Sequence, residues 1–189
     1  MLRNIVVTGF MGTGKSVIGQ NLASKLRYPF LDMDGLIEKR QGRTIREIFE
    51  TEGEAHFRQI EADLCRELAG WQGYVIATGG GTLVSLENQA TFAAENLVVC
   101  LDCDPEVLWL RLANSRNRPM LDSPDRQARL MALLESRQPA YAQIKHHVDT
   151  SNRPIYEIAA EIEGIWRRLR RRAKLKGARQ RNAGQSHRR

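Results

Sequence analysis

The stretch NIVVTGFMGTGKSVI, residues 4–18, decides the fold. It opens with a short apolar run typical of a buried β-strand and closes with the start of a helical pattern. Between the two, GFMGTGKS (9–16) satisfies the pattern G-x-x-x-x-G-K-[ST], whose backbone N–H groups wrap a polyphosphate at a helix N-terminus. A glycine turn with a chance Lys-Ser is the alternative, but the strand and helix both lie where the motif requires them. The sequence therefore predicts a nucleotide phosphate site.

Each part of this phosphate loop has an expected task. The Lys15 side chain is placed to reach the β and γ phosphates, and the Ser16 hydroxyl to ligate Mg²⁺. The expected nucleotide contacts within the loop are Gly12, Thr13, Gly14, Lys15, Ser16 and Val17.

Apolar β-type runs alternate with helical patterns along the rest of the chain. The runs lie at 4–8, 29–33, 74–78, 97–102 and 146–150. They are short and nearly continuously apolar, as strands of a parallel sheet covered on both faces are. Right-handed crossovers through the intervening helices make this an α/β layer fold. At 189 residues the chain suits one domain, which buries roughly 70% of its extended surface.

The net charge of +7 belongs to the C-terminus and not to the fold. Residues 167–189 contain 11 of the 29 Lys and Arg residues and no acid, which leaves 18 basic against 22 acidic residues elsewhere, a net charge of −4. We place the domain at 1–172 and expect 173–189 to be a basic tail, in which a helix extension is followed by disordered, solubilising residues. A nucleic-acid patch on this tail is the alternative.

The location of the protein in the cell and the redox state of its cysteines are predicted from sequence features. No apolar run approaches the ~20 residues of a membrane span, and the N-terminus has no signal-peptide core, so we expect a cytoplasmic protein without membrane contact. Three cysteines argue against a disulfide framework. Cys100 and Cys103 would point to opposite faces of a strand, which disfavours a shared metal, and no histidine has a partner at ligand spacing.

Two aspartates follow the second apolar run, in LDMDGLIEKR (31–40). If strand geometry continues that far, Asp32 and Asp34 face the phosphate loop together. One carboxylate would then hold the Mg²⁺ shell while the other accepts a proton from an attacking hydroxyl. Asp34 followed by Gly35 could instead cap the next helix.

Charged residues elsewhere supply candidate anion contacts. Helical spacing puts Glu54, Arg58 and Glu61 on one face, either as a solvated ion-pair ladder or as an oriented arginine in a pocket. That pocket would be walled by Ile45, Phe49 and Phe57. The polar segment NSRNRPML (114–121) suits a lid carrying Arg116 and Arg118, or an ordinary basic loop.

Together these stretches resemble the shikimate kinases. The matching pieces are GFMGTGKS, LDMDGLIEKRQGRTIREIF, EGEAHFRQIEADL, ATGGGTL, RNRPML and ESRQPAY, in order from residue 4 to about 165. The resemblance implies a three-layer α/β/α fold with a five-stranded parallel sheet. It also implies transfer of the γ-phosphoryl group of ATP, with Mg²⁺, to the 3-hydroxyl of shikimate in aromatic amino-acid biosynthesis. The implied enzyme is a cytoplasmic monomer with a lid at about 114–124.

The resemblance also implies roles for individual residues. Asp34 would engage the attacking hydroxyl, and Ser16 with Asp32 would surround Mg²⁺. Lys15 and Arg118 would act on the transferred phosphate. Shikimate would be held by Asp34, Arg58, Gly79, Gly80, Gly81 and Arg137. Arg111 and Arg153 would flank the adenine.

Three consecutive glycines, in ATGGGTLV (77–84), follow the third apolar run. They are expected to form a second anion cradle in which bare backbone lets an acceptor come close, with a tight strand-to-helix turn as the alternative.

Two other functions stay open at this point. One is a related kinase for another polyhydroxy acid such as gluconate, which the set of Arg58, Arg137 and Gly79–Gly81 disfavours. The other is a nucleotide-dependent switch or nucleic-acid-binding module, which would not need the aspartate pair beside a second anion pocket.

Overall fold

The computed structural model describes residues 2–113 and 125–186. The strands are β1 (Ile5–Gly9), β2 (Phe30–Asp32), β3 (Val75–Ala77), β4 (Leu97–Asp102) and β5 (His146–Asp149). The helices are α1 (Lys15–Leu26), α2 (Met33–Gln41), α3 (Ile45–Ala69), α4 (Leu86–Ala93), α5 (Pro105–Leu112), α6 (Arg126–Tyr141) and α7 (Ile155–Ser186), with a 3₁₀ turn η1 (Thr82–Val84).

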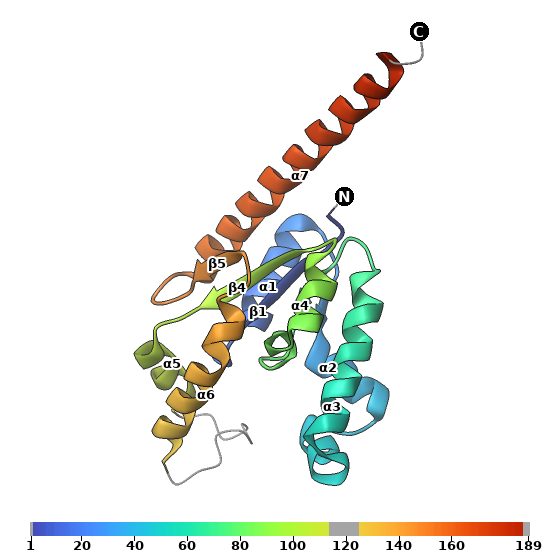
Figure 1. Cartoon of the computed structure of the whole chain (residues 1–189). Helices are drawn as coiled ribbons and strands as arrows, with labels where there is room; N and C mark the ends of the chain where they lie inside the picture. Colours follow the sequence, from blue (N-terminus) through green and yellow to red (C-terminus); the bar gives the residue numbers. More distant parts are fainter. Residues whose placement is uncertain (1, 114–124, 187–189) are drawn as a thin grey trace.

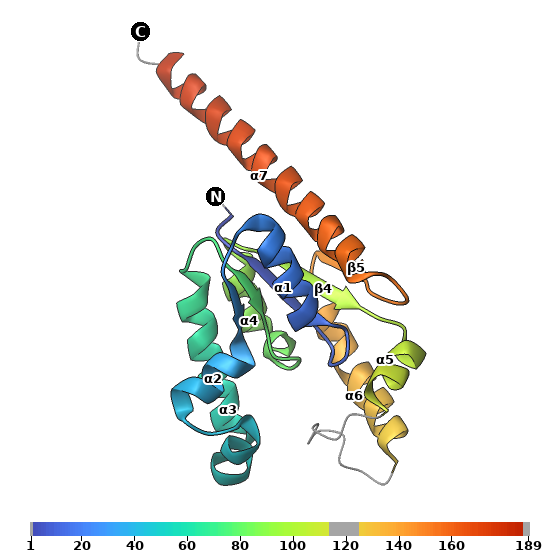
Figure 2. The ribbon, with the colours of Figure 1, turned by 180° about the vertical axis from the view of Figure 1, so that it is seen from behind.

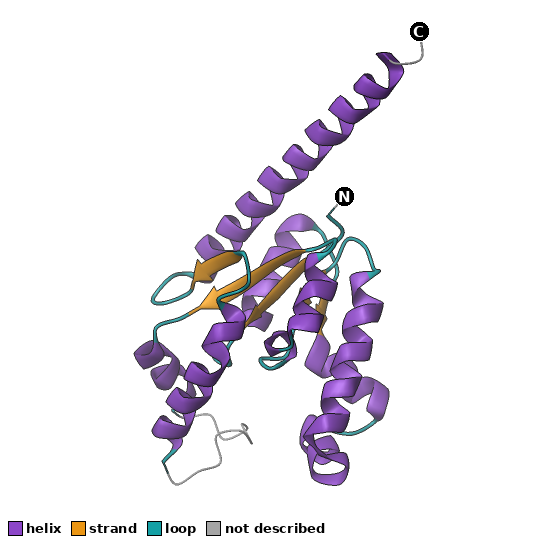
Figure 3. Cartoon of the chain, viewed as in Figure 1, coloured by secondary structure: helices purple, strands orange, loops and turns teal. Residues whose placement is uncertain are grey.

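The strands form one parallel sheet in the order β2-β3-β1-β4-β5. All five apolar runs of the sequence are strands, which confirms the expected α/β class. β1 lies in the middle of the sheet, between β3 and β4 (Figure 3). Because all strands run the same way, the loops that follow β1, β2 and β3 meet at one edge of the sheet.

Helices cover both faces of the sheet, as the three-layer prediction requires. On one face α1 and α7 pack together, in front of the sheet in Figure 2. The other face is covered by α3, α4, α5 and α6 (Figure 1). The core between α1, α7 and the sheet contains Val7, Val99, Leu22, Ile162 and Trp166. The opposite core contains Val6, Val98, Phe57, Phe92 and Leu130.

Local sequence signals fix where the helices begin. α3 starts at Ile45 because Thr44 and Glu47 form a capping box, with each side chain bonded to the other's backbone N–H. α5 starts after Asp104, whose side chain accepts from the N–H of Glu106. The α3 helix is interrupted at Gly53, which has φ 81°.

The start of the phosphate loop is pressed against β4. Gly9 has φ 137°, and a Cβ there would lie 2.5 Å from the carbonyl oxygen of Leu101. Only glycine fits such an approach, so the sheet itself sets the path of the chain into the loop.

The C-terminal segment extends the last helix, which was one part of the expectation for 173–189. Helix α7 continues as far as Ser186 and extends away from the sheet (Figure 1). The segment is rich in Arg, Lys, Ala and Gln, whose high helix propensity favours this continuation of the helix. Packing against the core reaches Trp166, which is 2% exposed, and Leu169. The domain boundary near 172 remains a prediction.

Within the described residues, no helix combines the length and apolar character needed to cross a membrane.

Deleting residues 173–189 should leave the fold and activity intact, because the buried side chains of α7, among those that the structure describes, lie before this segment. Urea unfolding should give a free energy within about 0.5 kcal/mol of the full chain, as for surface changes away from packed features. The matched variant Trp166→Ala should lose about 3–5 kcal/mol. A large loss of activity in the truncated chain at unchanged stability would contradict this account and place the tail in the site.

Candidate active site

A pocket of about 750 Å³ lies at the carboxyl edge of the sheet. It joins the phosphate loop to α2, α3 and the glycine triplet. The predicted site residues that line it are Gly12, Gly14, Lys15, Ser16, Val17, Asp32, Asp34, Arg58, Gly79, Gly80, Gly81, Arg111 and Arg137. The expected aromatic wall of Ile45, Phe49 and Phe57 is there too. A larger cavity of about 1030 Å³ lies elsewhere and is lined by none of these motifs.

The phosphate loop leads directly into α1, whose N-terminus faces this pocket. Gly14, at φ 92°, is the residue before the helix. Lys15 Nζ donates to the carbonyl oxygens of Gly9 and Phe10 at 3.0 Å each, so the side chain lies back along the loop. Thr13 differs from its neighbours: it is 1% exposed and donates its hydroxyl to the carbonyl of Phe10. Its side chain therefore braces the loop from within.

The two aspartates reach the pocket by a different route from the expected one. The strand ends at Asp32 and α2 begins at Met33, so strand alternation does not continue to Asp34. Asp32 is the helix cap, since its Oδ1 accepts from the N–H of Asp34 at 3.1 Å, and its Oδ2 accepts from Ser16 Oγ at 2.6 Å. The alternative prediction, that Asp34 caps this helix, is therefore wrong, and Asp34 lies in the first turn of α2.

The surroundings of the Asp34 carboxyl group disfavour its ionised form. Burial, followed by the negative charges of Asp32 and Glu61, raises its pKa to about 6, against the opposing effect of Lys15. A carboxyl group with a pKa near the working pH is suited to accept a proton in a reaction.

The glycine triplet makes room for charged side chains of the protein. A Cβ on Gly79 would lie 2.6 Å from Asp34 Oδ1, and one on Gly81 would lie 2.5 Å from Arg58 Nη1. Both distances are shorter than real Cβ contacts. The backbone is bare because an aspartate and an arginine from α2 and α3 lie against it, which the sequence alone did not indicate.

Arg58 is held by two glutamates of unequal burial. Its guanidinium donates to Glu54 at 2.8 Å and to Glu61, and Glu61 also accepts from the hydroxyl of Thr82. The Glu61 side chain is 1% exposed, whereas that of Glu54 is 59% exposed. Burial lowers the pKa of Arg58, but the glutamates outweigh it and raise the pKa overall. The oriented-arginine interpretation is therefore the one the structure supports.

Arg137 approaches the triplet from the opposite side, on α6. It is 7% exposed and donates to the carbonyl oxygen of Gly80 at 3.1 Å. Tyr141 donates its hydroxyl to the same oxygen, and burial raises the pKa of this phenol to about 12. Two of the guanidinium groups that line the pocket, those of Arg58 and Arg137, thus lie against the glycine triplet and are partly desolvated.

Of the remaining predicted contact residues, some line the pocket and others do not. Arg111 lines the pocket and donates to the carbonyls of Thr150 at 2.8 Å and Gly12 at 3.3 Å. Arg153 is not among the lining residues; it is bonded to the carbonyl of Asp149 and to Glu161. Arg116, Arg118 and the expected lid at 114–124 lie outside the described residues.

Sequence reasoning missed three side chains that support the pocket. Thr82 and Tyr141 fix Glu61 and Gly80, and Glu38 lines the pocket from α2. All three lie inside stretches that carry the family resemblance, LDMDGLIEKRQGRTIREIF, ATGGGTL and ESRQPAY, but their roles depend on contacts that the spacing along the chain does not show.

Comparisons with known proteins agree on one family. The sequence model for shikimate kinase matches residues 11–165. A shikimate kinase of Geobacter sulfurreducens is 43% identical over 160 residues, 85% of this chain and 88% of the relative. The chain belongs to the shikimate kinase family.

Solved structures agree with this assignment. A shikimate kinase from Acinetobacter baumannii in complex with shikimate matches with a TM-score of 0.82 and 34% identity, covering 87% of this chain and 93% of that one. A gluconokinase from Sinorhizobium meliloti matches with a TM-score of 0.60 and 20% identity, over 92% and 97% of the two chains. At that identity the second match shows the fold alone. For this family member, the P-loop kinase fold is confirmed.

Proposed function

We propose that this chain transfers the γ-phosphoryl group of ATP to the 3-hydroxyl of shikimate, giving ADP and shikimate 3-phosphate. One observation carries the proposal: a single pocket joins a phosphate loop to a proton-accepting carboxylate and two guanidinium groups. The bond between the hydroxyl oxygen and the γ-phosphorus forms as the bond from that phosphorus to the ADP oxygen breaks. The hydroxyl proton passes to Asp34.

The nucleotide end of the pocket binds phosphates through the loop. Backbone N–H groups from Gly12 to Ser16 and the positive end of α1 favour the β and γ phosphates. Lys15 neutralises charge that moves onto the leaving phosphate. Arg111 and Arg153 are assigned to the adenine end, and Arg118 to the phosphates, on the family resemblance.

The residues at the start of α1 and α2 fit a magnesium ion. Ser16 Oγ and the Asp32 carboxylate lie 2.6 Å apart, and both are the hard oxygen donors that Mg²⁺ prefers. Bound with ATP, Mg²⁺ would neutralise part of the phosphate charge. Asp32 keeps its second oxygen on the N–H of Asp34, which holds the carboxylate in place.

The acceptor end selects an anion that carries hydroxyl groups. Arg58 and Arg137 together offer two positive charges to the shikimate carboxylate, in a partly desolvated pocket where such pairs are strong. Asp34 lies against Gly79 and feels the charge of Lys15 in the phosphate loop, whereas Arg58 lies against Gly81. The substrate carboxylate is thus fixed away from the reacting hydroxyl. We assign the chain to the cytoplasm, as a monomer.

Asp34→Asn should retain ATP binding and lose about 10²–10⁴-fold in turnover, the range for a lost general base. The same variant should have a higher free energy of unfolding than the parent in the absence of Mg²⁺. An acid whose pKa in the folded state is raised from 3.8 to about 6 destabilises the fold when it is ionised. The gain in the free energy of unfolding is therefore complete above pH 6 and disappears toward pH 4. Thermal melts across pH and isothermal ATP titrations measure both effects. Asp63→Asn, at a side chain 61% exposed, is the control and should change neither. Unchanged turnover would remove Asp34 from the mechanism.

Glu61→Gln should raise the KM for shikimate about 10-fold or more, because a charged hydrogen bond worth ~1.5–3 kcal/mol no longer orients Arg58. The KM for ATP should stay unchanged. Glu54→Gln removes the exposed partner of the same arginine and should change the KM for shikimate less than about 3-fold. Steady-state kinetics with each substrate varied separates the two. Equal effects of the two variants, or a matching rise in the KM for ATP, would contradict the assigned role of Glu61.

A further inference from the structure

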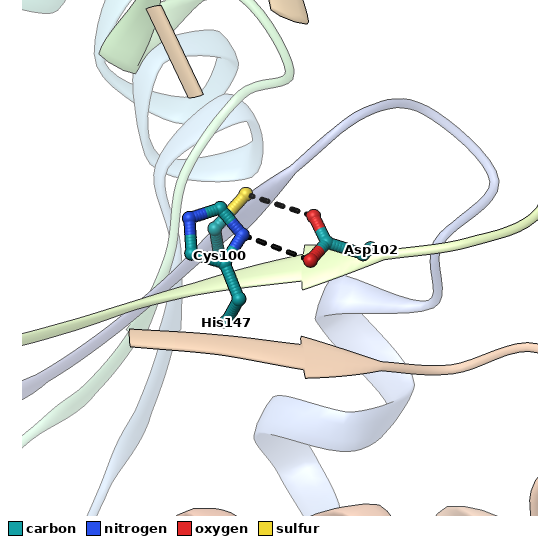
Figure 4. Close-up of side chains that lie close together, drawn as sticks. All are labelled: Cys100, Asp102 and His147. Atoms are coloured by element: carbon teal, nitrogen blue, oxygen red, sulfur yellow. Dashed lines mark hydrogen bonds and ion pairs between the residues drawn. The ribbon is translucent and has the colours of Figure 1, made fainter. Parts of the chain in front are cut away.

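Three potential metal ligands lie together on the neighbouring strands β4 and β5, and none of them is assigned to the proposed reaction. They are Cys100, Asp102 and His147, drawn in Figure 4. Cys100 Sγ lies 3.8 Å from Asp102 Oδ1, and His147 Nδ1 lies 2.8 Å from Asp102 Oδ2. The sulfur, nitrogen and oxygen atoms all lie within 4.8 Å of one another.

Strand geometry brings these side chains together. Cys100 and Asp102 are two residues apart in β4 and so point to the same face of the sheet. His147 is the direct partner of Cys100 in the parallel pairing with β5. The sequence analysis considered Cys100 only together with Cys103. The contact of Cys100 and Asp102 with His147 arises from the pairing of β4 with β5, which the spacing of residues along the chain does not reveal.

The spacing fits an ion with bonds of about 2.0–2.3 Å, which places tetrahedral ligand atoms roughly 3.3–3.6 Å apart. The observed distances of 2.8 and 3.8 Å fall on either side of this range, so small side-chain rotations about Asp102 suffice. Asp102 and His147 also line a cavity of about 490 Å³, which leaves an open coordination position for water.

The ligand types select the class of metal. A thiolate and an imidazole favour zinc-like ions over Mg²⁺ and Ca²⁺, which take oxygen ligands. The thiol of Cys100 is 1% exposed, and burial, followed by the negative charge of Asp102, raises its pKa to about 12. An ion of this class binds cysteine as the thiolate, so binding releases the proton of Cys100.

The surrounding structure holds the ligands in place. The carbonyl oxygen of Asp102 accepts from the backbone N–H and the hydroxyl of Thr150, each at 2.9 Å. Phe10 and Thr13 of the phosphate loop line the same cavity. The cluster thus lies behind the phosphate loop, and Ser16 and Asp32, assigned above to magnesium, are not part of it.

We propose that Cys100, Asp102 and His147 form a binding site for one zinc-class divalent transition-metal ion, with a fourth position open to the cavity.

Co²⁺ is the probe, added to the purified, metal-stripped full chain. The expected result is one equivalent bound, with the near-ultraviolet absorption of a thiolate–cobalt bond, a visible spectrum of tetrahedral type, and displacement by one equivalent of Zn²⁺. Cys100→Ala should abolish the thiolate absorption, and His147→Gln should weaken binding at least 10-fold. His147 is partly exposed, so its replacement keeps the test valid even if Cys100→Ala disturbs the core.

Cys103→Ala is the matched control, because this second thiol lines the same cavity. It should leave the cobalt spectrum and the stoichiometry unchanged. The proposal is overturned if the parent chain shows no thiolate absorption, if the absorption survives in Cys100→Ala, or if it is lost in Cys103→Ala. An unchanged affinity of His147→Gln for Co²⁺ would also overturn the proposal.

Discussion

The parallel pairing of β1 with β3 and β4 is the constraint on which the rest of the structure depends. It brings the chain segments that follow β1, β2 and β3 to one edge of the sheet. The phosphate loop, the aspartates and the glycine triplet are far apart in sequence and meet only because these strands end together. Gly9, which contacts the backbone of Leu101, fixes the loop to this pairing.

Charge balance is the second organising feature of the pocket. The half-buried carboxyl group of Asp34 lies near the buried one of Glu61, which disfavours ionisation of Asp34. Glu61, with Glu54, favours the positive charge of Arg58. Such an arrangement carries a cost in stability that a purely structural site would avoid. The glycines at 79 and 81 allow this crowding, because any side chain there would displace the charged groups.

The sequence predicted the strands, their parallel arrangement and most of the pocket, because apolar runs and the phosphate loop are local signals. It did not predict that Asp32 caps α2, since that depends on where a three-residue strand ends. It also missed Thr82, Tyr141 and the neighbours of His147, which are set by pairing between distant elements. The sequence indicated a helix extension after residue 172 but not its length, and helix propensity favours the continuation of α7 to Ser186.

The most direct test of the central claim is ADP release from Mg·ATP by the purified chain, with shikimate, gluconate, a nucleoside monophosphate or no acceptor. We expect ADP release that requires shikimate, with one shikimate 3-phosphate formed for each ADP. ADP release that requires gluconate instead would contradict shikimate as the acceptor, and only the assignment of the phosphate loop would stand. ATP binding without acceptor-dependent release would contradict the reaction itself.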